Sequence, residues 1–257
     1  MIKDTVVTDS AIVQLSPLDI ERFGIRSARA PSVTLETLPE IIQFCQTNQV
    51  IFLVARCGVE KLDAVHAMEQ AGFRLMDTLL MWSRDLVNRP LPSDDCAVSI
   101  RPLRTGEEGT VREIATEIFK GYFGHYHADP RLDRKQCDAA YVSWAERSCG
   151  LKSVAEEVLV AESDGELVGF ITLRRNSAEE GEAVVGGVLP EARRLGIYRS
   201  FLVHCMKWCL DQNCTRMLVS TQITNNAARK VWASLGYQPS HSYYTFHKWF
   251  DEGLRWT

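Results

Sequence analysis

Two short segments in the second half of the chain carry residue types that suit a phosphate-bearing ligand. In the first, a strand-like run with Gly186, Gly187 and Val188 leads through a proline into residues 193–199, which open a predicted helix. Amides at a helix start have no partner within the helix and the helix dipole adds partial positive charge, so a pyrophosphate fits there. The loop contains, in order, Arg193, Arg194, Leu195, Gly196, Ile197, Tyr198 and Arg199. Taken alone, the segment could equally be a surface turn rich in arginine.

The second segment follows one more predicted strand, residues 217–221. It is a helix that starts near Asn225, carries Trp232, and closes on Gly236 and Tyr237. The two segments are one strand–helix–strand unit apart, in a fixed order.

A third group of reactive side chains lies in residues 124–132, between two predicted helices. It contains His125, His127, Asp129 and Arg131. Histidine titrates near neutral pH, and arginine binds phosphate through two parallel hydrogen bonds. This loop is therefore predicted to bind the substrate that receives a transferred group, called the acceptor below, and to remove its proton. Either histidine taken alone could instead cap or pack. Their spacing completes no metal site, and the sequence predicts no metal.

Glu182 is another candidate base, because it lies on the strand that leads into Gly186. It could equally be a charge on an edge strand.

The composition is that of an ordinary globular protein. The chain has 257 residues, of which 24% are charged and 46% hydrophobic, and its formal net charge is −4. A nucleic-acid protein would usually carry a basic surface, so this class is disfavoured. An anionic ligand must therefore be attracted locally.

Targeting and membrane signals are missing from the sequence. Met1 to Thr5 show no charged start followed by an apolar stretch, and no run reaches 18 apolar residues. The expected location is the cytoplasm, without a membrane partner. The eight cysteines form no CxxC pair, and Cys205 and Cys209, one helical turn apart, are predicted to be small apolar filler.

A proline-containing linker at residues 88–95 divides the chain into residues 1–90 and 97–257. Hydrophobic periodicity predicts, before the linker, a helix over 35–47, a strand over 50–55, a helix over 59–71 and a strand over 73–86. After the linker it predicts a strand from 97, helices over 107–119 and 134–146, and strands over 157–162, 166–174 and 182–189. The elements of the two segments described first, a helix, a strand, a helix and a strand, follow them.

The strand, helix and strand before the linker resemble those that end the chain. The first helix closes on Gly72 and Phe73 as the last one closes on Gly236 and Tyr237. The similarity indicates an internal repeat, although this combination also recurs by chance in α/β proteins.

Residues 97–257 resemble the GCN5-related N-acetyltransferase (GNAT) superfamily. Members carry an Arg- or Gln-led loop with a glycine three residues on, followed by an Asn-x-x-Ala helix that ends in glycine and an aromatic. This sequence supplies Arg193, Gly196, Asn225, Ala228, Gly236 and Tyr237 in that order. The resemblance implies an α/β (α+β) GNAT fold, with a mixed, mostly antiparallel twisted sheet covered by helices on both faces.

The resemblance also implies roles for particular residues. Acyl-coenzyme A would bind the 193–199 loop and a splayed strand at Gly186, Gly187 and Val188, with a backbone amide near Val188 as donor to the oxyanion. Asn225 would contact the pantetheine arm, and Arg229 would reach a phosphate or lie in solvent.

Two residues depart from the family pattern. Tyr198 replaces the small residue that usually ends the loop, and Trp232 stands where many members carry a tyrosine that protonates the leaving sulfur. An indole N–H donates a hydrogen bond but is no acid near neutral pH, so Trp232 is predicted to pack or donate. A thiol with a pKa of about 8.5 is already a fair leaving group.

A looser resemblance links the chain to bacterial N-acetyltransferases of nucleotide-linked (dTDP or UDP) amino sugars, such as the dTDP-fucosamine enzymes. It rests on Phe23 and Gly24, on the Asp129-containing loop, and on Tyr141 and Trp144, which would contact the acceptor. Those enzymes also carry a partial GNAT-like domain before the catalytic one, which residues 1–90 would form here.

The sequence therefore predicts an N-acyltransferase that moves an acyl group from acyl-coenzyme A to the amine of a nucleotide-linked deoxyamino sugar by direct attack. Acetylation of a peptide N-terminus, lysine or polyamine is an alternative, as is a module that senses acyl-coenzyme A without turnover. The acyl group, acetyl or a longer or hydroxylated chain, and the oligomeric state, a homodimer included, are left open.

Overall fold

The computed structural model describes residues 12–251, which fall into two compact units. Unit 1 takes residues 12–79, Phe123–Gln136 and 241–251, and unit 2 takes Leu80–Tyr122 and Cys137–Ser240. Division of the sequence into residues 1–90 and 97–257, with a partial repeat in the first part, stays a prediction. The segment from Met1 to Thr5 lies outside the described residues.

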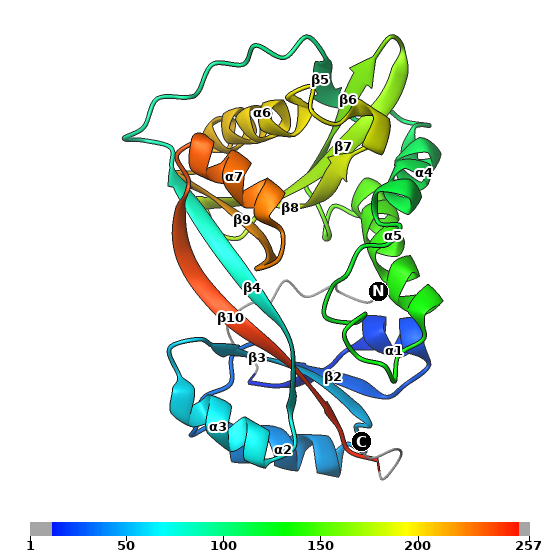
Figure 1. The fold of residues 1–257 in the computed structure, drawn as a ribbon, viewed down its shortest axis with the longest axis vertical. Helices are drawn as coiled ribbons and strands as arrows, with labels where there is room; N and C mark the ends of the chain where they lie inside the picture. The colour runs from blue at the N-terminus through cyan, green and yellow to red at the C-terminus, as the bar shows by residue number, and fades with distance from the viewer. Residues whose placement is uncertain (1–11, 252–257) are drawn as a thin grey trace. The chain divides into compact units, whose positions relative to one another are not determined.

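Unit 1 is a small sheet with helices packed against it (Figure 1). Its elements are β1 (Gln14–Leu15), α1 (Pro17–Phe23), β2 (Ser27–Ala30), α2 (Leu38–Thr47), β3 (Phe52–Gly58), α3 (Leu62–Gln70), the first part of β4 (Arg74–Asp85) and the second part of β10 (Gln238–Trp249). The strand order is β1-β2-β3-β10-β4. β2 runs parallel to β3, and β10 runs antiparallel to it.

The predicted elements of this unit are present with shifted ends. The helix expected from residue 35 begins at Leu38, where the proline in its first turn favours a helix start. β1, α1 and β2 were not predicted, because β2 is a short buried run without period-two alternation. α1 is likewise short, with Ser16 as its N-cap and Gly24 beyond its end.

Unit 2 contains the predicted order of a strand, two helices, three antiparallel strands, and then helix, strand, helix and strand. Its elements are β5 (Ser99–Pro102), α4 (Glu108–Ile118), α5 (Arg134–Gly150, from Cys137 on), β6 (Glu157–Ser163), β7 (Glu166–Arg175), β8 (Glu180–Val188), the 3₁₀ turn η1 (Pro190–Ala192), α6 (Ile197–Asp211), β9 (Arg216–Gln222) and α7 (Asn226–Ser234), with the ends of β4 and β10. Its strands follow the order β10-β4-β9-β8-β7-β6-β5. The turn predicted at residues 163–165 joins β6 to β7 as a hairpin.

Alternating side chains give the sheet of unit 2 two apolar faces. Leu159 and Ala161 of β6 belong to the cluster that α6 covers, whereas Val160 between them belongs to the cluster that α4 covers. Helices therefore lie on both faces, as the fold prediction requires (Figure 1).

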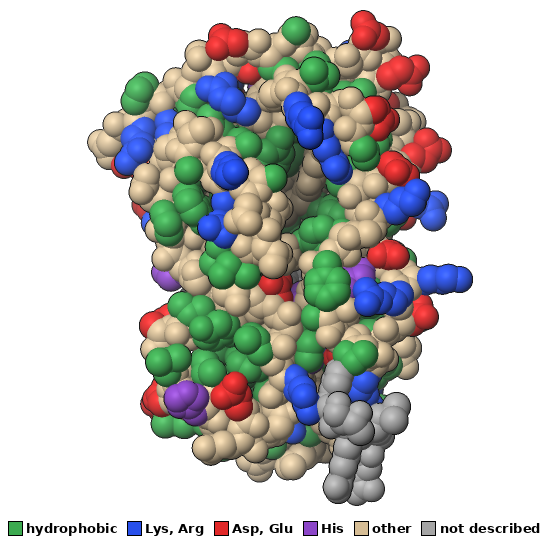
Figure 2. All heavy atoms as spheres, in the orientation of Figure 1, with side chains coloured by type: hydrophobic (Ala, Val, Ile, Leu, Met, Phe, Trp, Pro, Cys, Tyr) green, Lys and Arg blue, Asp and Glu red, His purple; other side chains and the backbone are tan. Residues whose placement is uncertain are grey.

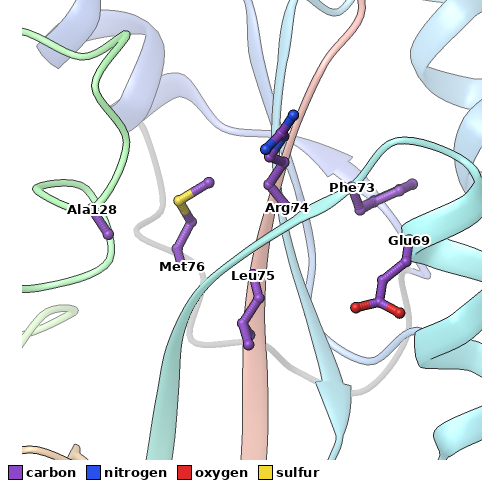
Figure 3. A pocket seen from close by; sticks show the side chains of 6 residues that line it. All are labelled: Glu69, Phe73, Arg74, Leu75, Met76 and Ala128. Atoms are coloured by element: carbon purple, nitrogen blue, oxygen red, sulfur yellow. The ribbon is translucent and has the colours of Figure 1, made fainter. Parts of the chain in front are cut away.

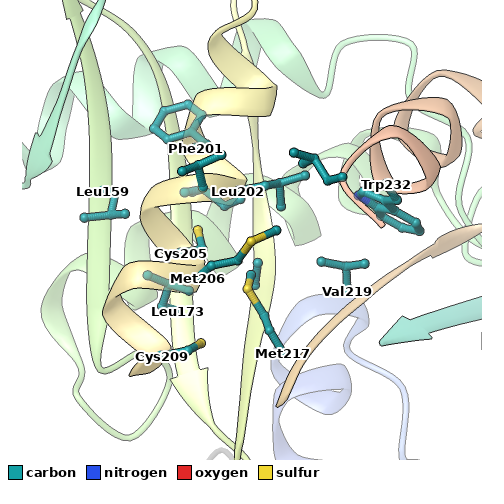
Figure 4. Packing of buried hydrophobic residues seen from close by; sticks show 14 of the residues in the cluster. Leu159, Leu173, Phe201, Leu202, Cys205, Met206, Cys209, Met217, Val219 and Trp232 are labelled. Carbon is teal, nitrogen blue, oxygen red and sulfur yellow. The ribbon is translucent and has the colours of Figure 1, made fainter. Parts of the chain in front are cut away.

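The buried side of α6 forms the centre of the larger cluster (Figure 4). Cys205 and Cys209 are fully buried there beside Phe201 and Leu202, which confirms their prediction as apolar filler. Among residues 12–251, no helix is long and apolar enough to cross a membrane.

Candidate active site

The end of β8 separates from β9 in unit 2. The parallel pairing of the two strands extends from Glu180 opposite Arg216 to Ala183 opposite Val219. Beyond Ala183, β8 stays paired with β7 alone, up to Val188 opposite Gly169. The structure thus shows the splayed strands that the sequence predicted.

A bulge in β8 sets the direction of this separation. The register between β7 and β8 shifts near Thr172, whose hydroxyl accepts a hydrogen bond from the Val185 amide at 3.2 Å. Such an extra residue bends a strand and re-aims the groups that follow it. A Cβ on Gly186, just after the bulge, would lie 2.4 Å from the Phe170 carbonyl oxygen, so only glycine fits this close approach.

The backbone of Val188 points into the gap that the splay opens. The Leu189 amide donates to the Val168 carbonyl at 2.8 Å, and Val188 lies opposite Gly169. In an antiparallel ladder, bonded and non-bonded pairs alternate, so the N–H and C=O of Val188 point away from β7. The predicted role of the Val188 amide as donor to an oxyanion requires this orientation and stays a prediction.

The start of α6 offers backbone amides to solvent. Gly196 is its N-cap residue, with a φ of 78° that glycine adopts without strain, and no side chain caps the helix. Arg193, Arg194 and Leu195 are exposed, whereas Ile197 is buried and anchors the first turn. The first amides of a helix without a cap suit an anion such as a pyrophosphate.

Arginines and neighbouring segments surround this helix start. The Arg193 Nε approaches the Val188 carbonyl oxygen at 3.4 Å, and one Arg199 nitrogen donates to the Ser93 carbonyl at 2.6 Å. Ser200 donates to Asp94 at 2.7 Å, so the linker is tied to the first turn of α6. Figure 2 shows several Lys and Arg side chains over α6 and α7, which supply local positive charge on a net negative chain.

Asn225 and Arg229, which were predicted to contact coenzyme A, form hydrogen bonds with groups at the start of α7. Asn225 is the N-cap, accepting from the Ala228 amide at 3.2 Å and donating to Thr221 at 3.0 Å. Arg229 donates to the Ile223 carbonyl at 2.7 Å. Both side chains shape the turn between β9 and α7.

Trp232 and Tyr198 form a buried pair between α7 and α6. The Trp232 indole donates to the Tyr198 hydroxyl at 3.0 Å, and Trp232 is 1% exposed. Burial raises the pKa of Tyr198 to about 12, although the bond from Trp232 opposes the rise. Among the tyrosines near the site in sequence, Tyr198 is the one bonded to Trp232.

The other tyrosines considered as substitutes for the missing acid lie elsewhere. Tyr237 is buried with its hydroxyl on the Met217 sulfur at 3.1 Å. Tyr243 and Tyr244 belong to unit 1, where they pair with Gly58 and Cys57 of β3.

An aromatic cluster of α4 and α5 flanks the glycines of β8. Tyr141 stacks on Phe119 with ring centroids 5.3 Å apart and meets Tyr122 at 4.8 Å. A Cβ on Gly187 would lie 2.9 Å from Ile118, which is the last residue of α4. Trp144 packs against the same cluster.

In unit 1 the two histidines of the predicted acceptor loop differ. The His127 Nδ1 accepts from the Gly124 amide at 3.2 Å, and the side chain is 5% exposed, so His127 fixes the loop. His125 is half-buried and its Nδ1 lies 2.9 Å from the Nε2 of His247, which sequence reasoning did not single out.

Asp129 is a buried carboxylate with several donors. One oxygen is 2.8 Å from the His247 Nδ1 and 2.9 Å from the Trp249 indole nitrogen, and the other accepts from the Arg131 amide at 3.0 Å. Burial alone would raise its pKa, but the hydrogen bonds from His247 and Trp249 lower it overall. The carboxylate is thus ionised at neutral pH.

The guanidinium of Arg131 is held within unit 1. It donates to both oxygens of Asp251 at 2.7–2.8 Å and lies 3.8 Å from the centre of the Trp249 ring. Its predicted contact with a phosphate would require these bonds to be exchanged.

Glu182 lies at the opposite end of β8 from Val188. It is 5% exposed and bonded to Arg174 at 2.7 Å. Six residues of a strand span about 20 Å, which separates Glu182 from the predicted oxyanion donor.

A hollow of about 520 Å³ in unit 1 is lined by residues of α3, β4 and the acceptor loop (Figure 3). Its lining residues are Glu69, Phe73, Arg74, Leu75, Met76 and Ala128. Ala128 lies between His127 and Asp129 in sequence, so one wall of the hollow belongs to the loop. Within residues 12–251, no group of three or more metal-binding side chains is present.

The departure of β8 from β9 and the uncapped start of α6 are the two backbone features that the resemblance to the GNAT superfamily implied. Residues 111–237 match the sequence profile of the acetyltransferase (GNAT) family. The chain therefore carries a GNAT-family domain and is an acyltransferase.

Relatives extend over nearly the whole chain. The spore coat polysaccharide biosynthesis protein SpsD of Bacillus subtilis (strain 168) is 21% identical over 247 residues, which are 94% of this chain and 80% of SpsD. A GCN5-related N-acetyltransferase from Sphaerobacter thermophilus shares the fold with a TM-score of 0.64 at 15% identity, covering 94% of this chain and 77% of that one. A conserved protein of unknown function from Staphylococcus epidermidis ATCC 12228 has a TM-score of 0.63 at 13% identity, and the match covers 96% of this chain and 95% of that one.

Proposed function

We propose that this protein transfers an acyl group from acyl-coenzyme A to the amine of a nucleotide-linked deoxyamino sugar. The observation that carries the proposal is the departure of β8 from β9 after Ala183, with the uncapped start of α6 beyond it. An extended pantetheine arm would lie along the free edge of β8, and its pyrophosphate would meet the amides of residues 196–199. Arg193, Arg194 and Arg199 would add charge at the same place.

In the proposed reaction the neutral amine attacks the thioester carbonyl carbon. A C–N bond forms, the C–S bond breaks, the thiolate of coenzyme A leaves, and the amine loses one proton. The Val188 amide would stabilise the negative charge on the carbonyl oxygen. The aromatic cluster with Tyr141 and Trp144 would bound the acceptor side.

The pair of Trp232 and Tyr198 would act by packing. The indole nitrogen is a donor already bonded to Tyr198, and burial raises the pKa of that hydroxyl to about 12. A thiol with a pKa of about 8.5 leaves without strong help from an acid, so its protonation can follow from solvent.

The nucleotide-linked acceptor is supported by chemistry and by one relative. SpsD is named for spore coat polysaccharide biosynthesis. The loop with His125, Asp129 and Arg131 adds groups that would recognise a polar, anionic acceptor. We further propose that residues 1–90 are a partial copy of the catalytic part, because β3-α3-β4 repeats the order of β9-α7-β10.

A panel of amines tests the proposal. The full chain is mixed with acetyl-coenzyme A and, in parallel, dTDP- and UDP-linked amino sugars, the free amino sugar, a lysine peptide and a polyamine, and released thiol is followed. Turnover is expected with a nucleotide-linked sugar, with the free sugar as the matched control for the nucleotide. Mass spectrometry of the product identifies the acyl group.

Other outcomes would replace parts of the proposal. Faster turnover with the peptide or polyamine would overturn the acceptor class. Binding of acetyl-coenzyme A by calorimetry without turnover on any amine would indicate a sensing module.

A further inference from the structure

The segment that joins β4 to β5 in unit 2 is bound at both ends to helices of the proposed donor site (Figure 1). We call residues 90–96 the strap. At its first end, buried Arg84 donates to the Pro90 carbonyl at 2.6 Å and also to the Leu235 carbonyl at the C-terminus of α7. A Cβ on Gly236 would lie 2.6 Å from the same guanidinium. The carbonyls at a helix end carry partial negative charge, so this cation joins α7 to the strap.

The other end of the strap lies on the first turn of α6. Asp94 accepts a hydrogen bond from the Ser200 hydroxyl at 2.7 Å; the Asp94 side chain is 16% exposed and Ser200 is 1% exposed. The His204 Nδ1 is 3.3 Å from the same carboxylate oxygen and 3.1 Å from the Ser200 carbonyl. Both of these oxygens accept hydrogen bonds, so this nitrogen carries a hydrogen. Hydrogen bonds to an ionised carboxylate are stronger than those between neutral groups.

Two more contacts join the strap to the residues that open α6. The Ser93 carbonyl accepts from one Arg199 nitrogen at 2.6 Å, and the Cys96 thiol donates to the Leu195 carbonyl at 3.5 Å. The other nitrogens of Arg199 form no hydrogen bond within residues 12–251, so they can still meet a phosphate. Cys96 also packs against the apolar cluster that α6 covers. The strap therefore holds both the α6 start and the Arg199 side chain.

The charge of the strap alone would disfavour an anionic ligand. Asp94 places a negative charge beside the helix start that would receive the pyrophosphate, and Asp95 adds a second. If these acids acted through charge only, removal of either one would strengthen the binding of coenzyme A. If Asp94 acts through the position of the strap, removal of its hydrogen bonds would weaken binding. The two roles therefore predict opposite signs.

We propose that Asp94 is a positioning residue for the donor, which holds the strap on α6 and thereby fixes the first amides of α6 and the Arg199 guanidinium for the pyrophosphate. This inference rests on the proposed function. Since Arg84 joins the strap to α7, the same segment links the two helices of the donor site. Without the bonds of Asp94, the α6 start would have to be ordered when coenzyme A binds, which lowers the affinity.

Calorimetry of coenzyme A binding by the full chain tests the proposal. Asp94→Ala should raise the Kd about five- to tenfold, because a charge-assisted hydrogen bond of the strap is lost. Asp94→Asn keeps an oxygen that accepts from Ser200 and should restore most of the affinity. Asp95→Ala is the matched control, because Asp95 is an exposed acid at the next position of the strap. Its removal should leave the Kd unchanged or slightly lower.

Amide hydrogen exchange examines the strap directly. In the free protein, Asp94→Ala should speed exchange at residues 200–203 of α6, whereas Asp95→Ala should not. In the wild type, coenzyme A should slow exchange at residues 94–96, because binding and docking of the strap must stabilise each other equally. With an amine that is turned over, Asp94→Ala should raise the KM of acyl-coenzyme A while kcat and the KM of the amine stay nearly unchanged.

Each result decides one question. Equal Kd values in Asp94→Ala and Asp95→Ala, or tighter binding in both, would overturn Asp94 as a positioning residue and leave the donor site in place. If Asp94→Ala does not fold, unchanged exchange at residues 94–96 of the wild type with coenzyme A would overturn it. Absence of coenzyme A binding by the wild type, with faster exchange in Asp94→Ala, would overturn the proposed function and the positioning role with it, although the strap would still be shown to hold α6.

Discussion

The proposed donor site and the histidine network of unit 1 use different parts of the chain. The proposed donor site, residues 186–188 and 193–199 of unit 2, uses main-chain groups of a bulged strand and a helix start. The histidine network, Asp129, His247 and His125, uses side chains from a loop and from β10, at positions 118–122 residues apart in the chain. Residues 193–196 of the proposed donor site are exposed, whereas Asp129 and His247 of the histidine network are each 1% exposed.

This difference predicts different responses to substitution. A main-chain site is sensitive to residues that alter backbone geometry and tolerates most changes of side chain. A buried side-chain network fails when one partner is removed, because an uncompensated polar group stays behind.

The largest effect is expected at Asp19, which anchors the loop that contains His125 through Tyr126. Asp19→Asn removes the charge that Arg29 and Tyr126 share and should lower the free energy of unfolding by about 3–5 kcal/mol. Urea unfolding measures the loss. Burial raises the pKa of Asp19, but Arg29 and the hydrogen bonds lower it overall. The stabilisation is therefore full above the unfolded pKa of about 3.9 and is lost as the pH falls below it.

Glu21→Gln is the matched control, because Glu21 is an exposed acid on the same helix. Its effect should stay within about 0.5 kcal/mol. Equal losses in the two variants would show that the network around Asp19 adds nothing to stability.

A smaller effect is expected at the close approach in the donor strand. Gly186→Ala places a Cβ 2.4 Å from the Phe170 oxygen and 2.6 Å from the Ile171 Cα, so β7 and β8 must separate. The cost should be about 2 kcal/mol, with weaker binding of coenzyme A. Thermal unfolding and calorimetry measure both.

Gly109→Ala provides the contrast, since a Cβ on Gly109 of α4 meets no atom within 4 Å. It should stabilise the chain by about 0.5–1 kcal/mol. A Gly186→Ala variant with normal stability and affinity would contradict the role of close strand packing.

The charge of Arg193 in the proposed donor site should contribute about 1.4 kcal/mol to the binding free energy of coenzyme A. Arg193→Glu reverses a charge beside the α6 start and should weaken coenzyme A binding about tenfold. Lys207→Glu makes the same change on an exposed position of α6 far from its start, and should leave the affinity unchanged. Unchanged affinity in Arg193→Glu by calorimetry would remove the pyrophosphate from this helix start.

The smallest effect is expected from the buried pair of α6 and α7. Trp232→Phe removes the hydrogen bond to Tyr198 and should cost about 1 kcal/mol of stability. Most of kcat should remain, because no proton transfer depends on the indole. A drop in kcat of about 10²-fold or more in a folded variant would instead assign Trp232 a catalytic role.

Local patterns in the sequence were sufficient to predict the backbone elements of the proposed donor site. The run that contains Gly186 forms a strand, and the loop of residues 193–199 leads into a helix, as expected. Binding of the donor at these elements stays a prediction. The order of the elements from β5 to β10 also follows from periodicity and turns.

Side-chain partners from distant segments could not be predicted in the same way. His247 lies on a strand whose local pattern gives no sign of Asp129 or His125. Arg131 was expected to bind a phosphate, and the structure shows it on Asp251, a partner that only the tertiary fold brings near. The side chain of Asn225 caps α7, and its contact with a pantetheine arm stays a prediction.

The uncapped start of α6 also bears on how such proteins diverge. A binding site made of peptide groups is rebuilt by any sequence that keeps the turn and one glycine, so neighbouring side chains can drift without loss of the ligand. The fold shared at 13% and 15% identity shows that most residues can change while the strands and helices are kept. Under the proposed function, recognition of the donor would therefore change slowly in evolution, because it depends on the backbone of β8 and α6.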